Sequence, residues 1–380
     1  MGQVVLVTGV AGDLGRRCAA QLSTAPGVDR VVAVDVLPPR GDLGGADFVR
    51  ADIRNPVIAK VIVRERVDTV VHTSVAATAA AAGGRSSTKE LNVIGTMQLL
   101  AACQQAPEVR KLVVKSSAAF YGASHRDPAM FTEDMTAKRL PGSGYAKDVT
   151  EVESYTRGFA RRRPDVAVTT LRTANVLGPT IASSMSGYFG LPVLPSVLGF
   201  NPRLQFLHEQ DALDVLQHAA TADVAGTYNV AGDGVLTLSQ AVRRLGRPTL
   251  PMPAALVPTF GSALRQTRVA DFSPDAVAFL TYGRGLDTTR MRSMLGFEPR
   301  YTTEQALADF AAAVGPGVIA PQRVRAIERS LVSAMRTERR EPVPAAALPT
   351  WEAAQEAAHD ADREARPTRA RATERGGHDG

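Results

Sequence analysis

Three glycines near the start of the chain have a spacing that suits phosphate binding. Gly9, Gly12 and Gly15 follow the apolar run Val4–Val7 and open a helical pattern. In such a turn the first glycine allows a tight bend, the second lets a pyrophosphate approach the backbone, and the third lets the helix pack closely on the strand. The free N–H groups and the positive end of the helix dipole then face the anion. The sequence therefore predicts a dinucleotide-binding turn.

An acidic residue at the end of the next apolar run supports this prediction. Asp35 lies in the predicted strand Arg30–Val36, about twenty residues past the last glycine, where a carboxylate would bind a ribose 2′-hydroxyl. Because the same charge would repel a 2′-phosphate, the sequence favours NAD over NADP. Arg16 and Arg17 keep NADP open as an alternative.

The elements that must position these residues alternate in type along the first half of the chain. Short apolar runs alternate with helical patterns, which is typical of a parallel sheet with helices on both faces. The further predicted strands are Asp47–Arg50, Asp68–Val75, Lys111–Ser117 and Val166–Leu171, and the predicted helices are Pro56–Arg66, Thr88–Gln105 and Tyr145–Arg162. We expect an α/β fold in which residues 1–178 form a Rossmann-type, doubly wound parallel sheet.

The alternation of apolar runs and helical patterns becomes less regular after Gly178, where prolines interrupt the apolar runs. We expect residues 179–315 to form a smaller C-terminal substrate lobe, interleaved with the Rossmann core and closing over a cleft. Its predicted elements are the strands Leu204–His208 and Gly226–Val230 and the helices Gln210–Thr221, Thr237–Leu245 and Asp287–Leu295. Residues 316–380 are rich in Ala, Arg, Glu and Pro, a composition that predicts a largely disordered tail.

Composition narrows the class of protein. The chain has 380 residues, of which 44% are hydrophobic, so it can bury a large core. No apolar run approaches the roughly eighteen residues that span a bilayer, and Met1–Thr8 lacks the features of an export signal. Cys18 and Cys103 have no partner spacing and are interpreted as reduced thiols. We therefore expect a cytoplasmic protein that does not bind a membrane.

Charge and metal-ligand patterns argue against two further classes. The formal net charge is +6 at pH 7, but no basic stripe alternates with aromatic residues. No group of histidines, cysteines or carboxylates has the spacing of metal ligands. We expect neither nucleic-acid binding nor a metal site. His72 and His208 are interpreted as packed residues rather than as bases.

A series of motifs follows the glycine turn along the chain. They are Thr8–Gly15, Asp52-Ile53, Asn92–Thr96, Ser116–Gly122, Leu171–Asn175, His208–Asp211, Tyr228–Val230 and Leu295–Pro299. Through these motifs the chain resembles the extended short-chain dehydrogenase/reductases of the NAD-dependent epimerase/dehydratase family. The similarity covers roughly residues 3–312 and leaves out the tail.

The resemblance implies a set of residues that contact NAD. Beyond the glycines, the set is Asp13, Leu14, Asp35, Asp52, Ile53, Thr73, Ser74, Val75, Ala76 and Asn92. Asp13 and Leu14 would lie against the pyrophosphate, and Asp52 and Ile53 beside the adenine. Residues 73–76 would form the wall under the nicotinamide half, supported by the asparagine at position 92. On the substrate side, Asn175 matches an asparagine of the family.

The same resemblance implies a hydroxyl pair that handles the proton of the substrate. Tyr145, in Gly-Tyr-Ala-Lys-Asp, matches the tyrosine that accepts a proton from the carbinol oxygen. A tyrosine hydroxyl has a pKa of about 10, which must fall toward neutrality for this role. Ser117, four residues before Tyr121, matches the serine that hydrogen-bonds the same oxygen. Both residues would also contact NAD.

One position departs from the family pattern. A lysine four residues after the tyrosine would lower the phenol pKa and hold the nicotinamide ribose, but here that position is Val149. Lys147 would point elsewhere, because a two-residue offset rotates a helical side chain by about 200°, and Asp148 would raise the phenol pKa. Lys115 lies two residues before Ser117 on one predicted strand, so both side chains would share a face about 7 Å apart. We expect Lys115 to supply the missing charge; the alternative is a lysine that faces solvent.

The sequence leaves three functions open, of which the first is favoured. The first is an NAD-dependent epimerase or dehydratase that oxidises and re-reduces a hydroxyl of a sugar nucleotide. The family's nucleotide-contacting arginine would fall on Leu204, so the adjacent Arg203 is the candidate contact. The second is a non-catalytic NAD-binding sensor or scaffold, and the third is a reductase or dehydrogenase of a small apolar alcohol or ketone. The family often pairs through two long helices, here Thr88–Gln105 and Tyr145–Arg162, which would give a homodimer with a four-helix contact.

Overall fold

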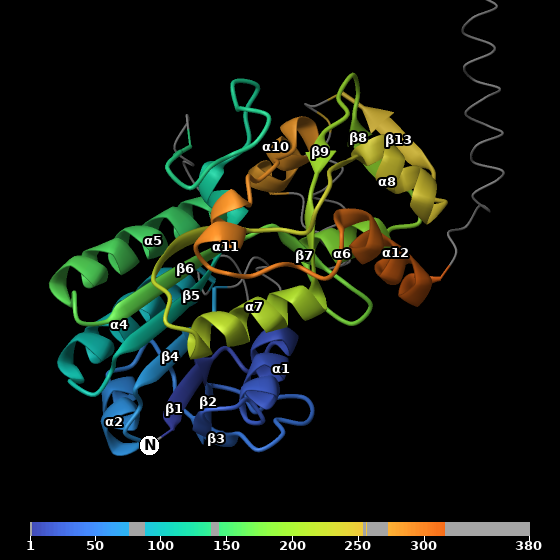
Figure 1. Cartoon of the computed structure of the whole chain (residues 1–380). Helices are drawn as coiled ribbons and strands as arrows, with labels where there is room; N and C mark the ends of the chain where they lie inside the picture. The colour runs from blue at the N-terminus through green and yellow to red at the C-terminus, as the bar shows by residue number, and fades with distance from the viewer. Residues whose placement is uncertain (1, 76–87, 138–143, 254–255, 257–272, 316–380) are drawn as a thin grey trace, which may run out of the picture. The chain divides into compact units, whose positions relative to one another are not determined.

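A computed structural model of the chain describes residues 2–75, 88–137, 144–253, 256 and 273–315 (Figure 1). The chain divides into two compact units, Met1–Arg325 and Ala326–Gly380, and every described residue belongs to the first. The tail predicted over residues 316–380 lies outside the described residues. Among the helices that the structure describes, none combines the length and the apolar composition needed to cross a membrane.

A parallel sheet forms the centre of the first unit. Among the described residues its seven strands are β1 (Gln3–Thr8), β2 (Val28–Asp35), β3 (Asp47–Arg50), β4 (Thr69–His72), β5 (Lys111–Ser117), β6 (Ala167–Thr173) and β11 (Gly226–Val230). Their spatial order is β11-β6-β5-β4-β1-β2-β3, and every neighbouring pair runs parallel. The chain thus builds outward from β1 in both directions, which confirms the predicted doubly wound Rossmann-type sheet and places the binding crevice at the carboxyl ends of the strands.

Helices cover both faces of this sheet (Figure 1). On one face α1 (Asp13–Leu22) packs against α7 (Glu209–Thr221), and on the other α2 (Val57–Arg64), α4 (Thr96–Gln105) and α5 (Gly144–Arg162) lie in succession. Each helix presents an apolar stripe to the strands; in α1 the buried positions are Gly15, Cys18, Ala19 and Leu22, which recur at helical spacing. Cys103 is buried in the same way on α4.

The two cysteines are packing residues of this core. Both are free thiols, and burial raises the pKa of Cys18 and of Cys103 to about 12. A thiol with such a pKa stays protonated and unreactive at neutral pH. The interpretation of both residues as reduced thiols therefore agrees with the structure.

The helix predicted over Thr88–Gln105 changes its winding part-way. Its first half contains the π-helix η2 (Glu90–Gly95), which then continues into α4. A π-helical turn is wider than an α-helical one and is frequent at functional sites. Asn92, one of the predicted cofactor residues, is fully buried within it.

A second hydrophobic core lies among the elements from β7 (Asn175–Leu177) onward, but α11 (Thr289–Ser293) is not part of it, because its Met291 packs in the first core. The elements that contribute to it are β7, α6 (Ser184–Gly190), β8 (Leu194–Val197), β9 (Arg203–Leu204), β10 (Phe206–His208), β12 (Leu236–Thr237), α8 (Leu238–Leu245), β13 (Thr249–Met252), α10 (Pro274–Tyr282) and α12 (Thr303–Val314). Phe189, Phe206 and Phe310 meet at its centre. Because α7 and β11 return to the first core, the two sets of elements are interleaved along the chain.

Two predicted elements of this region differ in the structure. The strand expected over Leu204–His208 is divided into β9 and β10, because the side chain of Gln205 between them turns inward, donates to the carbonyl of Gly232 (Nε2···O 3.0 Å) and accepts from the amide of Leu286 (Oε1···N 2.8 Å). The helix expected over Asp287–Leu295 is only α11, since the Asp287 carboxylate accepts the N–H of Thr289 at 2.8 Å and holds the segment before it in a turn.

Candidate active site

The glycine turn joins β1 to α1 and has the shape of a phosphate cradle. Gly9 has a φ of +81° and a Cβ there would lie 2.9 Å from the amide nitrogen of Ser74, whereas a Cβ on Gly15 would overlap the carbonyl oxygen of Gly9. A Cβ on Gly12 would meet only that same carbonyl oxygen, at 3.5 Å. The protein itself therefore requires Gly9 and Gly15, while Gly12 keeps open the space in front of the helix. Because the first-turn N–H groups of α1 have no partner within the helix, this space fits a pyrophosphate.

Asp35 lies beside this turn, at the end of β2. One carboxylate oxygen accepts from the amide of Ala11 (2.9 Å) and the other from the amide of Val36 (2.7 Å). Arg16 and Arg17 are the reason in the sequence to keep NADP as an alternative cofactor, but both have other partners. Arg16 donates to the carbonyl of Asp42 (2.9 Å), and Arg17 pairs with Glu209 (2.7 Å). This arrangement suits a ribose with a free 2′-hydroxyl.

The wall predicted under the nicotinamide adjoins the glycine turn. Thr73 Oγ1 donates to the carbonyl of Thr8 at 2.6 Å, Ser74 lies against Gly9, and Val75 is buried. Ala76 lies outside the described residues.

The residues predicted beside the adenine follow β3. Asp52 accepts hydrogen bonds from the guanidinium of Arg54, among them Nε···Oδ1 at 3.0 Å and Nη2···Oδ2 at 2.7 Å, and this contact lowers the pKa of its carboxyl group. Ile53 packs against η2 so closely that a Cβ on Gly95 would lie 2.9 Å from its Cδ1. The loop at 52–53 and the π-helix are thus fitted to each other.

A buried hydrogen-bond chain runs from β1 to α5 beneath these residues. Thr96 Oγ1 donates to the carbonyl of Asn92, so it must accept from His72 Nε2–H (2.8 Å), and His72 Nδ1 then accepts from Thr8 Oγ1 (2.8 Å). The Asn92 side chain in turn donates to Asp148 Oδ2 (3.1 Å) on α5. His72 is therefore neutral with both ring nitrogens satisfied, and burial lowers its pKa to about 4. This agrees with its interpretation as a packed residue.

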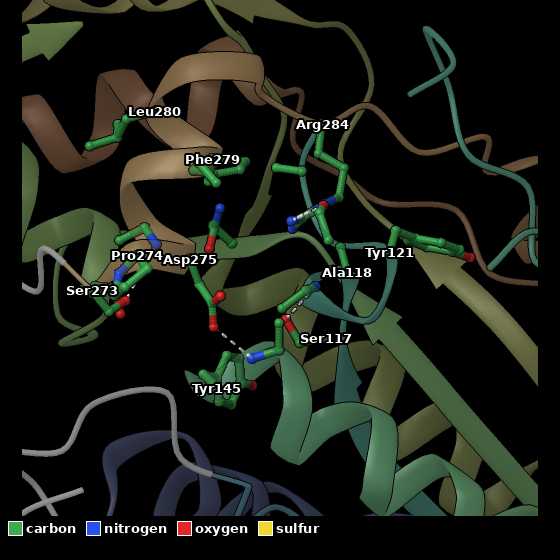
Figure 2. Close-up of a pocket in the computed structure, with 18 of the residues that line it drawn as sticks. Ser117, Ala118, Tyr121, Tyr145, Ser273, Pro274, Asp275, Phe279, Leu280 and Arg284 are labelled. Atoms are coloured by element: carbon green, nitrogen blue, oxygen red, sulfur yellow. Dashed lines mark hydrogen bonds between the residues drawn. The ribbon is translucent and has the colours of Figure 1, made fainter. Parts of the chain in front are cut away.

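The predicted hydroxyl pair and the predicted asparagine line one cavity of about 390 Å³ (Figure 2). Ser117 ends β5, and its Oγ accepts from the amide of Ala119 at 3.1 Å, which caps the short 3₁₀ helix η3 (Ala118–Tyr121). Tyr145 lies in the first turn of α5, and Asn175 begins β7. Helices α6 and α10 of the second core supply the opposite wall. The cavity is therefore at the carboxyl end of the sheet, where the two cores meet.

A fully buried ion pair supports η3 from below. Arg172 on β6 pairs with Glu153 on α5 (Nη2···Oε2 2.7 Å), donates to the hydroxyl of Tyr121 (2.9 Å), and stacks 3.7 Å over the ring of Phe120. Ser116 Oγ donates to the same Glu153 carboxylate at 2.6 Å. Burial lowers the pKa of Arg172, but its contacts to Glu153 outweigh that effect and the pKa is raised. The segment that carries the site serine is thus anchored on both sides by residues of the sheet and of α5.

Comparison with known proteins places this site in a family. The model of the NAD-dependent epimerase/dehydratase family matches residues 5–231. The chain belongs to that family. The match confirms the resemblance seen in the sequence, and the family's name agrees with the predicted cofactor, NAD.

Relatives and solved structures extend the comparison. An uncharacterized protein of Mycobacterium tuberculosis, Rv0501, is 47% identical over 348 residues, which cover 90% of this chain and 93% of that protein. MoeE5, solved in complex with UDP-glucuronic acid and NAD, is similar in fold with a TM-score of 0.65 and 22% identity over 82% of this chain and 98% of its own. UDP-glucose 4-epimerase from Thermotoga maritima, solved with UDP-glucose, has a TM-score of 0.62 and 20% identity over the same shares.

Three positions that the sequence analysis compared with the family pattern lie outside the cavity lining. Val149, at the position expected for lysine, is fully buried in the first core. Lys115 is partly buried on the same face of β5 as Ser117 and does not line the cavity. Its ammonium group forms no hydrogen bond or ion pair with the described residues. The side chain of Arg203 is exposed on β9 and is also outside the cavity.

Among the described residues, the cation that lines the cavity is Arg284, which sequence reasoning missed. Its Nε donates to the carbonyl of Gly122, directly after η3, at 2.8 Å. The available signal was an arginine between two glycines, Gly283 and Gly285, shortly before the motif at Leu295. Nothing local in that signal shows which cavity the side chain enters.

Proposed function

We propose that the chain is an NAD-dependent oxidoreductase of the epimerase/dehydratase type, which oxidises and re-reduces a hydroxyl group of a sugar nucleotide. The observation that carries the proposal is the convergence of Ser117, Tyr145 and Asn175 on one cavity at the carboxyl end of the sheet. The glycine turn and Asp35 lie at the same end of the sheet and suit a dinucleotide. The neighbours solved with UDP-glucuronic acid or UDP-glucose support a sugar nucleotide as the substrate class.

The side chains at the two sites would have separate roles in catalysis and in cofactor binding. Bound NAD would supply the hydride chemistry at the carbinol carbon in both directions. Tyr145 would take the hydroxyl proton, and Ser117 would hold the same oxygen by a hydrogen bond. The two contacts would position the hydroxyl proton and the carbinol carbon for reaction at the same time. Gly12, Asp13 and Leu14 would hold the pyrophosphate at the start of α1, and Asp35 the adenosine ribose.

Lys115 is our proposed replacement for the missing lysine. It shares a face of β5 with Ser117, and an ammonium group without a partner among the described residues can stabilise a nearby phenolate. We expect Lys115→Met to lower turnover and weaken NAD binding, whereas Lys60→Met, on the exposed side of α2, should change neither. Unchanged turnover and NAD affinity in Lys115→Met would remove this role.

A second candidate function is supported by Val149. Without a lysine at this position the chain could bind NAD and act as a sensor or scaffold. The discriminating experiment is to test the purified full chain for NAD(H) by calorimetry and then to incubate it with UDP-sugars and with simple secondary alcohols. Product analysis and absorbance of reduced nicotinamide report turnover. Conversion of a UDP-sugar that Tyr145→Phe abolishes supports the enzyme; NAD binding without any conversion supports the sensor, and conversion of only the alcohols supports a simple dehydrogenase.

Two further expectations belong to this proposal. We propose a cytoplasmic location, because the chain keeps Cys18 and Cys103 as buried free thiols. We also propose a homodimer in which η2 with α4 and the adjacent α5 pair with their counterparts. Sedimentation of the purified chain would show a species of twice the mass of 40.3 kDa, and a purely monomeric species would contradict the dimer.

A further inference from the structure

Arg284 is held in the cavity wall by close packing of its backbone on both sides. Gly283 has a φ of +71°, and a Cβ there would overlap the backbone of Arg203 on β9. A Cβ on Gly285 would lie 2.5 Å from the sulfur of Met130. The amide of Arg284 donates to the carbonyl of Arg203 at 3.0 Å. The two glycines thus let the segment lie between β9 and the loop at 130, which fixes where the side chain of Arg284 begins.

The guanidinium group of Arg284 uses only part of its hydrogen-bonding capacity. Nε and Nη2 both donate to the carbonyl oxygen of Gly122. Within the part of the chain that the structure describes, Nη1 has no hydrogen bond and the group forms no direct ion pair. A guanidinium carries five N–H donors in a planar fork that matches a carboxylate. The donors that remain point toward the cavity that Ser117 and Tyr145 also line (Figure 2).

Two carboxylates of the same cavity keep this group charged. Asp127 accepts from the amide of Ser124 at 2.6 Å, and Asp275 accepts from the amide of Ala146 at 3.2 Å, so each is tied to its own backbone surroundings. Burial lowers the pKa of Arg284 to about 10, while the charges of Asp127 and Asp275 act to raise it. At neutral pH the guanidinium is therefore cationic.

We propose that Arg284 binds a carboxylate group of the substrate, close to the hydroxyl that Ser117 and Tyr145 handle. The inference rests on the proposed function and narrows its substrate class to acidic sugars carried on a nucleotide. Gly122, which anchors the guanidinium, is five residues beyond Ser117, and a 3₁₀ segment rises only about 2 Å per residue. The carbonyl of Gly122 therefore lies within about 10 Å of Ser117, and the guanidinium bonded to it lines the same cavity as Ser117 and Tyr145. This arrangement lets Arg284 reach an anionic group on a substrate whose hydroxyl contacts those two residues.

A matched pair of ligands tests this directly. The full chain, saturated with NAD, is titrated calorimetrically with UDP-glucuronate and with UDP-glucose, which differ at one carbon. A charge-assisted hydrogen bond contributes enough to change affinity by about 10- to 100-fold, so the wild type should prefer the acid by at least about tenfold. Arg284→Gln should bring the ratio close to one, and Arg284→Lys should retain part of it. NAD affinity should be the same in all three proteins.

Controls separate this role from a structural one. Arg243→Gln, on the exposed side of α8, matches the chemical change and should keep the preference. Thermal unfolding of Arg284→Gln reports any loss of packing, which would weaken both ligands equally and leave their ratio unchanged. An equal affinity of the wild type for the two ligands, or a preference that survives in Arg284→Gln, would overturn the inference. So would loss of the preference in Arg203→Gln alone. Failure of the chain to bind NAD would instead contradict the proposed function.

Discussion

The glycine turn and the cavity lined by Ser117 and Tyr145 are built in different ways. The turn is made by residues that are close in sequence, and each of its three glycines has a geometric reason that can be stated from its neighbours on β1, α1 and the segment after β4. The cavity is assembled from η3, the start of α5, β7, α6 and α10, which are far apart in the chain. The two positions that depart from the expected family pattern, Val149 and Leu204, are buried outside the cavity lining, one in each core. The difference shows that the turn follows from local sequence, whereas the cavity depends on how distant elements pack together.

The support of the cavity also differs from that of the turn. The turn depends on close backbone contacts, whereas η3 depends on one buried ion pair, Arg172 with Glu153, and on the groups bonded to it. A buried charge that loses its partner is expensive, so the cavity is more vulnerable to a single substitution. The following predictions test this contrast.

The largest effect is expected from Arg172→Met. It leaves the buried Glu153 carboxylate with only the exposed Arg157, whose Nη1 lies 3.5 Å from Oε2, as a cationic partner, which should lower the free energy of unfolding by about 3–5 kcal/mol. Urea denaturation followed by circular dichroism measures the change. The exposed pair of Arg244 with Glu304 provides the matched control, because Arg244→Met should cost about 1 kcal/mol or less. A similar loss in the two variants would show that the cavity has no special dependence on its ion pair.

Ser117→Ala tests the chemistry of the cavity rather than its stability. Removing the hydroxyl should reduce turnover by about 10²- to 10⁴-fold with the substrate that the ligand panel identifies. Loss of the cap on Ala119 should cost only about 1 kcal/mol of stability. Ser293→Ala, on the exposed side of α11, serves as the control and should keep full turnover. A turnover of Ser117→Ala that stays within about threefold of the wild-type value, which is the scatter of such assays, would contradict this role of Ser117.

His72, which lies on β4 next to the glycine turn, should make the stability of the folded protein sensitive to acid. Its pKa is lowered to about 4 in the folded protein, so between pH 6.5 and 4 the unfolded chain binds a proton that the folded chain does not. Stability from this residue is complete above the unfolded value and is lost as the pH falls, by up to about 3 kcal/mol. The measurement is the urea midpoint at pH 7.5 and at pH 4.5, compared with His72→Gln. Equal pH dependence of the two proteins would rule out this linkage.

The smallest effects are expected from substitutions of Gly12 and Gly15 in the turn, which should differ in what they change. Gly15→Ala places a Cβ against the carbonyl of Gly9 and should cost about 1–3 kcal/mol of folding free energy. Gly12→Ala has room in the folded protein and should leave stability nearly unchanged, yet it should weaken NAD binding because it fills the space that the pyrophosphate needs. Thermal unfolding and NAD calorimetry on both variants check this. Equal NAD affinity in Gly12→Ala and the wild type would mean that the phosphates bind elsewhere.

The amino-acid sequence alone determined the features that depend on short-range rules. The sheet, the glycine turn, the position of Asp35 and the neutral state of His72 follow from apolar periodicity and from contacts between neighbouring strands. The prediction of one strand over Leu204–His208 failed because Gln205 is drawn inward by Gly232 and Leu286, which no local pattern records.

Only the tertiary structure decided which cation enters the cavity. The sequence pointed to Arg203, but that side chain is exposed and the cavity receives Arg284, whose carbonyl partner Gly122 is 162 residues away in the chain. A side chain's direction depends on the backbones packed around it, here β9 and the loop at Met130, and these meet only after both cores have formed. Residue type and spacing therefore predicted the glycine turn, and long-range packing set which side chains line the cavity.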